Sequence, residues 1–281
     1  MKIIIDSGST KSDWRLVQSD GSFRQLTAKG INPATMSESA IRQIISEIRN
    51  QTSATDKTGA EVYLYTAGAT SQVHIDICTK ILREVFPTAV HIEVTNDLIG
   101  AARAACGHNP GIAAIVGTGS NSCFWDGEKI ERRIYSGGLI LGDEGGGATL
   151  GRLFLADFIK GLVPQEIADE FSARYPSDYS SIICNVYNSG TSPSGYLGSL
   201  APFIIEHYSN PYIKELVDNN FRSFIRRSLK QHDTDRYPVG VVGGFGYALK
   251  DVFSRIAAEE GITVSRFIKA PIDGLVEYHK C

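Results

Sequence analysis

The chain has 281 residues, a formal net charge of −3 and a sequence pI near 6.1, and its composition is that of an ordinary globular protein. This weakly acidic balance gives no basic footprint for nucleic acid or for an anionic membrane, so we expect a small-molecule partner. Five cysteines without a C-x-x-C pair and six scattered histidines argue against a disulfide framework and a zinc site.

The chain opens with a predicted strand, a turn of small residues and a second strand. Residues 2–5 are mainly β-branched, which is typical of a strand buried on both faces, and residues 12–17 predict its partner. Residues 6–10, DSGST, form a tight turn whose backbone N–H groups can face an anion. The turn therefore resembles a phosphate site, although a solvated hairpin turn also has this composition.

The rest of the first half alternates strands and helices. Its predicted strands are residues 22–29, 61–66 and 90–95, and its predicted helices are residues 37–49, 71–86 and 98–106. The resulting order is β-β-β-α-β-α-β. Asp97 stands at the end of the last strand, where it could serve as a helix N-cap or face a ligand. Residues 107–111, GHNPG, are the predicted hinge to the second half.

Residues 113–125 repeat the first hairpin without a gap, and a third strand near residues 130–135 follows them. The repeat aligns Gly8 with Gly119, Ser9 with Ser120 and Trp14 with Trp125. Such a repeat predicts duplicated halves. Asp6 is replaced by Gly117 in the second copy, so only the first turn can hold a hydrated metal ion.

The second half continues with the segment GGLILGDEGGG from residue 137 and a helix over residues 148–161. Residues 164–232 are predicted to be a helical insertion on the outside of this half, interrupted by a loop at residues 188–198. A buried strand at residues 239–242 then runs into the glycines of 243–246. A helix at 247–260, a strand at 264–268 and a closing helix at 271–279 complete the chain.

The chain is thus predicted to form an N-terminal lobe, residues 1–107, and a C-terminal lobe, residues 108–281, with the closing helix able to pack back on the first. No apolar run approaches the roughly 20 residues that a membrane span requires, and the first residues predict a strand rather than a leader. We therefore expect a cytoplasmic protein.

The small-residue and acidic motifs fall at the carboxyl ends of predicted strands, where ligands bind in open α/β sheets. Their order, D-x-G-x-T-K, Asp97, GTGSN, GDEG and a late glycine turn, resembles that of sugar kinases of the actin, Hsp70 and hexokinase superfold. Over nearly its whole length the chain resembles the BadF/BadG/BcrA/BcrD ATPase family and, within it, the N-acetylglucosamine kinases. The resemblance implies two ribonuclease H-like α/β lobes of duplicated βββαβαβ topology with an interlobe ATP cleft, and a possible homodimer.

The resemblance also implies roles for individual residues. Asp97 would be the general base, and Asp6 would hold Mg²⁺ through water. The ATP-binding residues would be Asp6, Gly8, Ser9, Thr10, Lys11, Gly117, Thr118, Gly119, Gly243, Gly244 and Gly246. The sugar-binding residues would be Asn32, Ser120, Asn121, Gly138 and Asp143. Each motif keeps a structural alternative: a solvated side chain for Lys11, and a strand-to-helix turn for residues 243–246.

The implied activity is ATP-dependent phosphorylation of a hexose or amino sugar, above all N-acetylglucosamine to its 6-phosphate. The segment before GDEG departs from the family pattern GGWG, because residues 137–142 are shorter and lack the Trp, which leaves the sugar open. Two alternatives remain. One is an ATPase that activates a partner enzyme, as the dehydratase activators of the same family do. The other is a sugar sensor without turnover.

Overall fold

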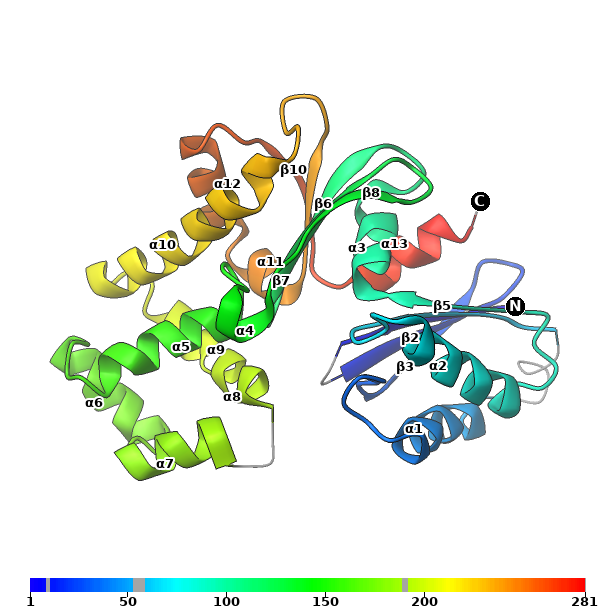
Figure 1. Cartoon of the computed structure of the whole chain (residues 1–281), viewed down its shortest axis with the longest axis horizontal. Coiled ribbons are helices and arrows are strands. Elements are labelled where there is room, and N and C mark those ends of the chain that lie inside the picture. Colours follow the sequence, from blue (N-terminus) through cyan, green and yellow to red (C-terminus); the bar gives the residue numbers. More distant parts are fainter. Residues whose placement is uncertain (9–10, 53–58, 189–191, 281) are drawn as a thin grey trace. The chain divides into compact units, whose positions relative to one another are not determined.

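The structure is a computed structural model that describes residues 1–8, 11–52, 59–188 and 192–280. The chain divides into two compact units (Figure 1). Unit 1 contains residues 1–108 and 270–281, and unit 2 contains residues 109–269. Each unit is built around one five-stranded sheet.

The sheet of unit 1 has the order β3-β2-β1-β4-β5. Its strands are β1 (Lys2–Ser7), β2 (Lys11–Val17), β3 (Phe23–Lys29), β4 (Glu61–Thr66) and β5 (His91–Asn96). The first three strands form an antiparallel meander, and β4 and β5 run parallel to β1. The carboxyl ends of β1, β4 and β5 therefore lie at the same edge of the sheet.

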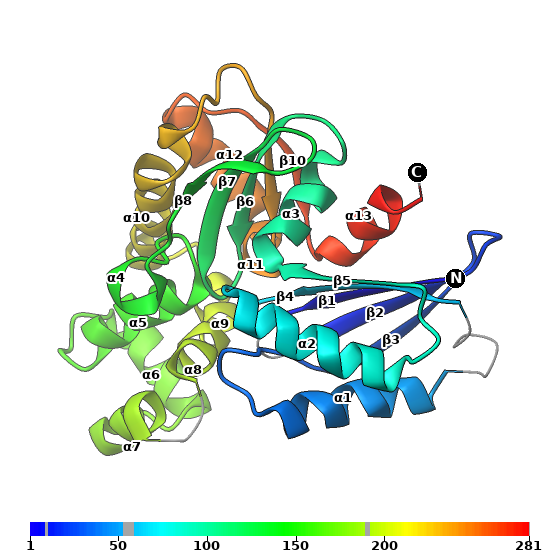
Figure 2. The same ribbon diagram turned by 45° about the vertical axis from the view of Figure 1, so that its right-hand side comes forward.

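Helices cover both faces of this sheet. They are α1 (Glu38–Asn50), α2 (Gln72–Val85), α3 (Asp97–Cys106) and α13 (Pro271–Tyr278). Figure 2 shows α1 and α2 on one face and α3 and α13 on the other. Ile3 and Ile5 pack in the core with α1 and α2, while Ile4 is fully buried on the opposite side of the strand. This arrangement explains the unbroken apolar run of β1, and Ser37 and Ser71 cap the two helices as their sequences indicate.

The sheet of unit 2 repeats this topology. Its strands are β6 (Gly111–Val116), β7 (Ser120–Trp125), β8 (Ile130–Ile134), β9 (Val239–Val242) and β10 (Val264–Ile268). Their order is β10-β9-β6-β7-β8, again an antiparallel meander with two parallel strands beside its first member. Trp14 and Trp125 occupy equivalent strands and both are fully buried. The predicted α/β fold with duplicated lobes is confirmed.

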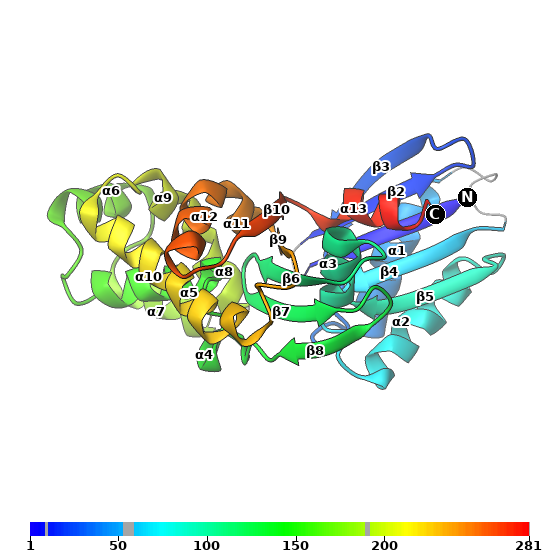
Figure 3. The same cartoon turned by 90° about the horizontal axis from the view of Figure 1, so that it is seen from above.

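Helices make up most of unit 2 (Figure 3). They are α4 (Gly138–Leu141), α5 (Gly147–Phe158), α6 (Gln165–Arg174), α7 (Tyr179–Ile183), α8 (Pro193–Ser199), α9 (Ala201–Glu206), α10 (Pro211–Arg227), α11 (Gly244–Ala248) and α12 (Lys250–Glu259), with a π-helical turn at Cys184–Asn188 and a 3₁₀ turn at Leu229–Gln231. The predicted insertion is largely helical, and it shares the hydrophobic core of unit 2. Phe171, Phe203 and Phe221 share one hydrophobic core with Ile112 and Val116 of the sheet.

The predicted loop at residues 188–198 is wrong over its second half, because helix α8 begins at Pro193. Glycines made this segment look like a loop, but here they permit close packing. A Cβ on Gly151 of α5 would lie 2.1 Å from the Leu197 carbonyl oxygen, and a Cβ on Gly198 would lie 3.1 Å from Thr118. Proline at the first helical position also favours a helix start.

The predicted helix at residues 247–260 begins earlier and is broken in two. Gly243 alone has a positive φ, 131°, whereas Gly244 and Gly246 already belong to α11. The break falls at Leu249, whose backbone leaves the helical region before α12 starts. A Cβ on Gly246 would lie 2.9 Å from Val116 Cβ, so these glycines serve packing against β6 as well as the turn.

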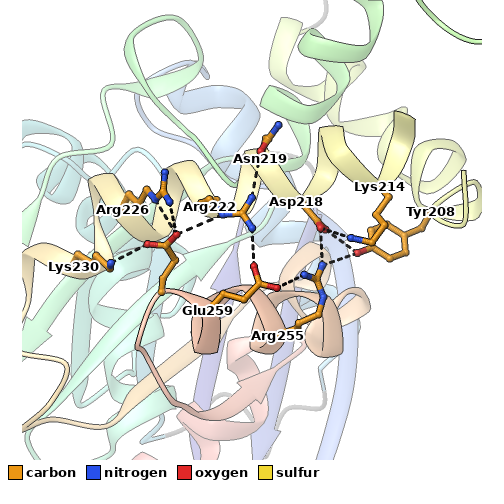
Figure 4. A network of polar contacts seen from close by, with 10 residues as sticks. Tyr208, Lys214, Asp218, Asn219, Arg222, Arg226, Lys230, Arg255 and Glu259 are labelled. Carbon is orange, nitrogen blue, oxygen red and sulfur yellow. Dashed lines mark hydrogen bonds and ion pairs between the residues drawn. The ribbon is translucent and has the colours of Figure 1, made fainter. Parts of the chain in front are cut away.

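A polar network joins α10 to α12 (Figure 4). Asp218, only 7 % exposed, accepts hydrogen bonds from Tyr208 Oη at 2.8 Å, Lys214 Nζ at 2.6 Å and Arg255 Nη2 at 2.7 Å. Removing the buried carboxylate takes an acceptor from Tyr208 and from two cations whose side chains are 40–49% exposed, so water compensates part of the loss. We expect Asp218→Ala to lower the free energy of unfolding by about 2 kcal/mol in urea titrations. Glu215→Ala, an exposed acid on the same helix, should change it by only about 0.5 kcal/mol. Equal losses of unfolding free energy in Asp218→Ala and Glu215→Ala would contradict a stabilising role for this network.

His279, at the end of α13, is buried within unit 1. Its Nε2 lies 2.7 Å from Tyr65 Oη, which also accepts from Arg103 Nη1 at 2.7 Å. Burial and the nearby Arg103 lower the pKa of His279 to about 3. Below pH 6.5, His279 therefore binds a proton in the unfolded chain but not in the folded chain, so the free energy of unfolding falls as the pH falls.

Between pH 7 and pH 5, we expect the free energy of unfolding to fall by about 1–2 kcal/mol less in His279→Gln than in the wild type. Urea unfolding at the two pH values measures this difference. Gln can still accept from Tyr65, which limits other changes. Identical slopes of unfolding free energy against pH in the two proteins would contradict a neutral buried His279.

The helices of the described residues include none with the length and apolar character that a membrane span requires.

Candidate active site

The first turn of unit 1 places an acid at the end of β1 opposite a second acid on β2. Asp6 pairs with Asp13 across the hairpin. The Gly8 N–H donates to the Lys11 carbonyl at 3.1 Å and closes the turn, and Lys11 Nζ lies 2.8 Å from Asp13 Oδ1. Lys11 is thus ion-paired rather than only solvated. Ser9 and Thr10, both predicted to bind phosphate, lie outside the described residues.

Three carboxylates gather at this edge of unit 1. Burial and, to a smaller extent, the negative charges of Asp13 and Asp97 together raise the pKa of Asp6 to about 7, while Lys11 opposes the rise. Asp97 therefore lies near enough to Asp6 to act on its charge, as two parallel strand ends separated by one strand allow. Asp6 and Asp97 occupy one edge of the sheet.

Asp97 is the first residue of α3 and is not its N-cap. Asn96 fills that position, because its Oδ1 accepts the Ile99 N–H at 2.9 Å. The structural alternative for Asp97, a capping role, is therefore wrong. The neighbouring amide does the capping, and the carboxylate of Asp97 is not needed for it.

The loop that carries Asn32 is tied to the same edge. The Ile31 N–H donates to Ser7 Oγ at 2.7 Å, at the end of β1, and Thr66 Oγ1 at the end of β4 donates to the Ile31 carbonyl at 2.5 Å. Asn32 Oδ1 accepts the Ala34 N–H at 3.0 Å. Gly68 touches the same oxygen, since a Cβ there would lie 2.0 Å from it and the φ of Gly68 is 89°.

The second turn, in unit 2, is held by the start of α5. The Gly117 N–H donates to the Gly119 carbonyl at 3.0 Å. The carbonyls of Gly117 and Thr118 accept from Gly147 N and Ala148 N, each at 2.9 Å. Beyond the turn, Ser120 is buried at the start of β7, and Asn121 Oδ1 accepts the Ser122 N–H at 3.0 Å.

Asp143 lies over this second turn. Its Oδ1 accepts the Ser120 N–H at 3.3 Å, and a Cβ on Gly119 would lie 2.8 Å from its Oδ2. Burial raises the pKa of Asp143, while hydrogen bonds from Ser120 and Ser136 oppose the rise. Its φ of 53° is the single positive value among the described non-glycine residues. Gly138, in the one-turn helix α4, has a φ of 71° and accepts from Gly142 N at 2.8 Å, directly before Asp143.

A cavity of about 330 Å³ lies beside Gly117 and Thr118 of the second turn. Its walls combine the turn with small and apolar residues of the four helices α5, α8, α9 and α11, namely Gly117, Thr118, Gly147, Gly198, Ala201, Pro202, Ile205, Gly244, Phe245 and Ala248. Gly243 is forced to be glycine, because a Cβ there would lie 2.4 Å from the Val116 carbonyl oxygen at a φ of 131°. Gly244 lines the cavity directly. Gly243 and Gly246 instead pack against Val116 of β6, beside the cavity wall.

Comparison with solved structures decides the family. No family model and no curated protein sequence matches the chain. A protein of Porphyromonas gingivalis named "putative N-acetylglucosamine kinase" is 34% identical, with a TM-score of 0.92 over 99% of this chain and 98% of that one. The chain belongs to the family of this kinase-like protein.

More distant members of this fold share the architecture. A protein of the same name from Chromobacterium violaceum is 17% identical, with a TM-score of 0.80 over 99% of this chain and 98% of that one. A ROK family glucokinase of Streptomyces griseus, solved with glucose and AMPPNP, is 16% identical, with a TM-score of 0.59 and the same coverage. These likenesses place the family within the actin and hexokinase type of fold.

Two residues of this family member escaped the sequence analysis. Asp13 pairs with Asp6 across the hairpin. The sequence could have indicated this pair, because a hairpin register that pairs Lys2 with Val17 also pairs Asp6 with Asp13. Gly68 ends the turn after β4 and contacts Asn32, which is visible only in three dimensions.

No group of three or more His, Cys, Asp or Glu side chains among the described residues is arranged to ligate a metal directly. The acidic cluster of unit 1 nevertheless fits a hydrated divalent cation. Burial raises the pKa of Asp6, and repulsion by the charges of Asp13 and Asp97 adds to the rise; a cation beside Asp6 would relieve that repulsion. Hydrated Mg²⁺ keeps several waters and needs only one or two carboxylates.

Proposed function

We propose that this protein is an ATP-dependent sugar kinase that phosphorylates a hexose or amino sugar, with N-acetylglucosamine and its 6-hydroxyl as the expected substrate and position. We also propose that it belongs, with the N-acetylglucosamine kinases, to the BadF/BadG/BcrA/BcrD ATPase family. The name of its 34%-identical relative supports the sugar, and the motif order supports the wider family.

The turn at residues 117–119 is the observation that carries the proposal. Its first two residues, Gly117 and Thr118, line the 330 Å³ cavity, and its third, Gly119, lies against the carboxylate of Asp143. The cavity has glycine backbone and apolar walls suited to a flat base, while a carboxylate is a strong acceptor for sugar hydroxyls. A phosphate chain that leaves the cavity along the turn would therefore approach a sugar bound at Asp143.

We propose the following roles for the other residues of the site. Backbone amides of the two turns would hold phosphate oxygens, with Lys11 as a neighbouring cation. Gly243, Gly244 and Gly246 would bound the adenosine. Ser120, Asn121 and Gly138 would contribute to the sugar site from unit 2, and Asn32 would contribute from unit 1.

Asp97 would take the proton of the attacking hydroxyl. Asn96 rather than Asp97 caps α3, and Asp97 lies near enough to Asp6 for their charges to interact at the edge of the sheet where the sugar would be phosphorylated. Asp6 and Asp13 would hold Mg²⁺ through water molecules. When bound, the ion supplies neutralisation of the charge on the β- and γ-phosphates.

A screen of ADP release tests the proposal. Hexoses, N-acetylhexosamines and muramic acid derivatives are incubated with Mg-ATP, and ADP is measured by coupled oxidation of NADH. We expect one sugar, N-acetylglucosamine first, to raise ADP release at least tenfold over ATP alone. Release that is independent of every sugar indicates an ATPase instead, and a thermal shift by sugar without ADP indicates a sensor.

A further inference from the structure

Helix α10 presents one face to the loop that carries Asp143. Three of its residues, Asn220, Phe224 and Arg227, lie at spacings of four and three, which places them along a single side of the helix. The opposite region of α10 is fixed to α12 by the network of Figure 4, in which Arg222 Nη2 meets Glu259 at 2.7 Å. The helix is therefore a rigid support on which the loop rests.

Each of the three residues contacts a successive part of the loop. Asn220 uses both ends of its amide: Oδ1 accepts the Gly145 N–H at 2.9 Å and Nδ2 donates to the Gly146 carbonyl at 3.2 Å. Phe224 packs under Gly145, where a Cβ would lie 2.6 Å from the Phe224 Cβ. Arg227 Nε lies 2.7 Å from Glu144 Oε1.

The loop needs such a support because Asp143 has a sparsely populated backbone conformation. Its φ of 53° is uncommon for a residue with a Cβ and persists only where the surroundings enforce it. Local bonds hold one end: the Asp143 carbonyl accepts from Gly146 N at 3.0 Å and from Thr149 Oγ1 at 2.7 Å. Asn220 holds the following two residues, Gly145 and Gly146.

Asn220 is 3 % exposed, and the two hydrogen bonds described above tie its side-chain amide to this loop. An apolar side chain would fill the space at lower desolvation cost, so the amide is explained by the backbone groups that it satisfies. We propose that Asn220, in the helical insertion, is a positioning residue that sets the direction of the Asp143 carboxylate and so the affinity for sugar. This inference rests on the proposed sugar-kinase function.

The test compares Asn220→Ala, which loses both bonds, with Asn220→Asp, which keeps the acceptor for Gly145 N–H and nearly the same shape. Asn219→Ala is the matched control, because Asn219 is exposed on the same helix and bonds only to Arg222 among the contacts of Figure 4. Steady-state rates give KM for the sugar and for ATP separately, and thermal melting reports folding.

We expect the sugar KM to rise roughly 10- to 100-fold in Asn220→Ala and less in Asn220→Asp, with the ATP KM within about threefold of wild type. Asn219→Ala should match wild type in both. The inference is overturned if the sugar KM is unchanged in Asn220→Ala and Asn220→Asp proteins that are folded. It is also overturned if the KM for the sugar and the KM for ATP rise equally. A wild-type protein that transfers phosphate to no sugar refutes the proposed function instead, before any variant is compared.

Discussion

Asp97→Asn is expected to lower kcat for sugar phosphorylation by roughly 10²- to 10⁴-fold, because an amide cannot take the proton of the attacking hydroxyl. Asparagine has nearly the same shape, and Asn96 rather than Asp97 caps α3, so the helix should remain intact. Binding of a non-hydrolysable ATP analogue, measured by calorimetry, should stay within about threefold of wild type. The loss should therefore appear in the chemical step alone.

Asp76→Asn is the control for this substitution, since it makes the same chemical change on the exposed face of α2 in the same unit. Its kcat should equal that of wild type. A wild-type rate in Asp97→Asn would remove Asp97 from the mechanism. A rate loss accompanied by loss of nucleotide binding would show that Asp97 acts on the phosphates and not on the sugar.

Gly119→Ala is expected to lower kcat/KM for the sugar by about 10- to 100-fold. Gly119 does not need a positive φ, so the backbone can accept alanine, but the new Cβ would lie 2.8 Å from Asp143 Oδ2 and 3.0 Å from its Cγ. The carboxylate must move, and a displacement of about 1 Å at a reacting centre can cost this much. The measurement is the sugar dependence of ADP release at saturating ATP.

Gly117→Ala separates the two sides of the same turn. A Cβ on Gly117 meets no protein atom within 4 Å, yet Gly117 lines the 330 Å³ cavity. This variant should raise the KM for ATP and leave the KM for sugar within about threefold. If Gly117→Ala and Gly119→Ala change the same parameter, the turn does not divide a nucleotide side from a sugar side.

Much of the fold could be predicted because its signals are local. The apolar run of residues 2–5, the Gly-Ser turns and the two tryptophans specify both hairpins and their relationship, and the structure confirms equivalent sheets. The helices predicted over residues 37–49 and 71–86 are confirmed as α1 and α2, and the structure shows that the hydroxyls of Ser37 and Ser71 cap them. Asp97 could be placed at a strand end, but the sequence could not decide between it and Asn96 as the cap.

The remainder depends on contacts between distant segments. Helix α8 contains Gly195 and Gly198, which locally favour a loop, and the packing of α8 on Gly151 of α5 outweighs that preference. The insertion joins the core of unit 2 because its aromatic residues meet the sheet, which no local pattern reveals. Asn220 lies 77 positions from Asp143, so its role in holding the Asp143 loop required the structure.

Product analysis shows whether the protein transfers the γ-phosphoryl group of ATP to a sugar hydroxyl. Protein, Mg-ATP and N-acetylglucosamine are incubated to completion, and the products are separated and examined by mass spectrometry and ³¹P NMR. We expect one sugar monophosphate for each ADP, with the phosphate coupled to the protons of carbon 6. ADP accompanied by inorganic phosphate and unaltered sugar, with this and every other hexose or amino sugar, would contradict it.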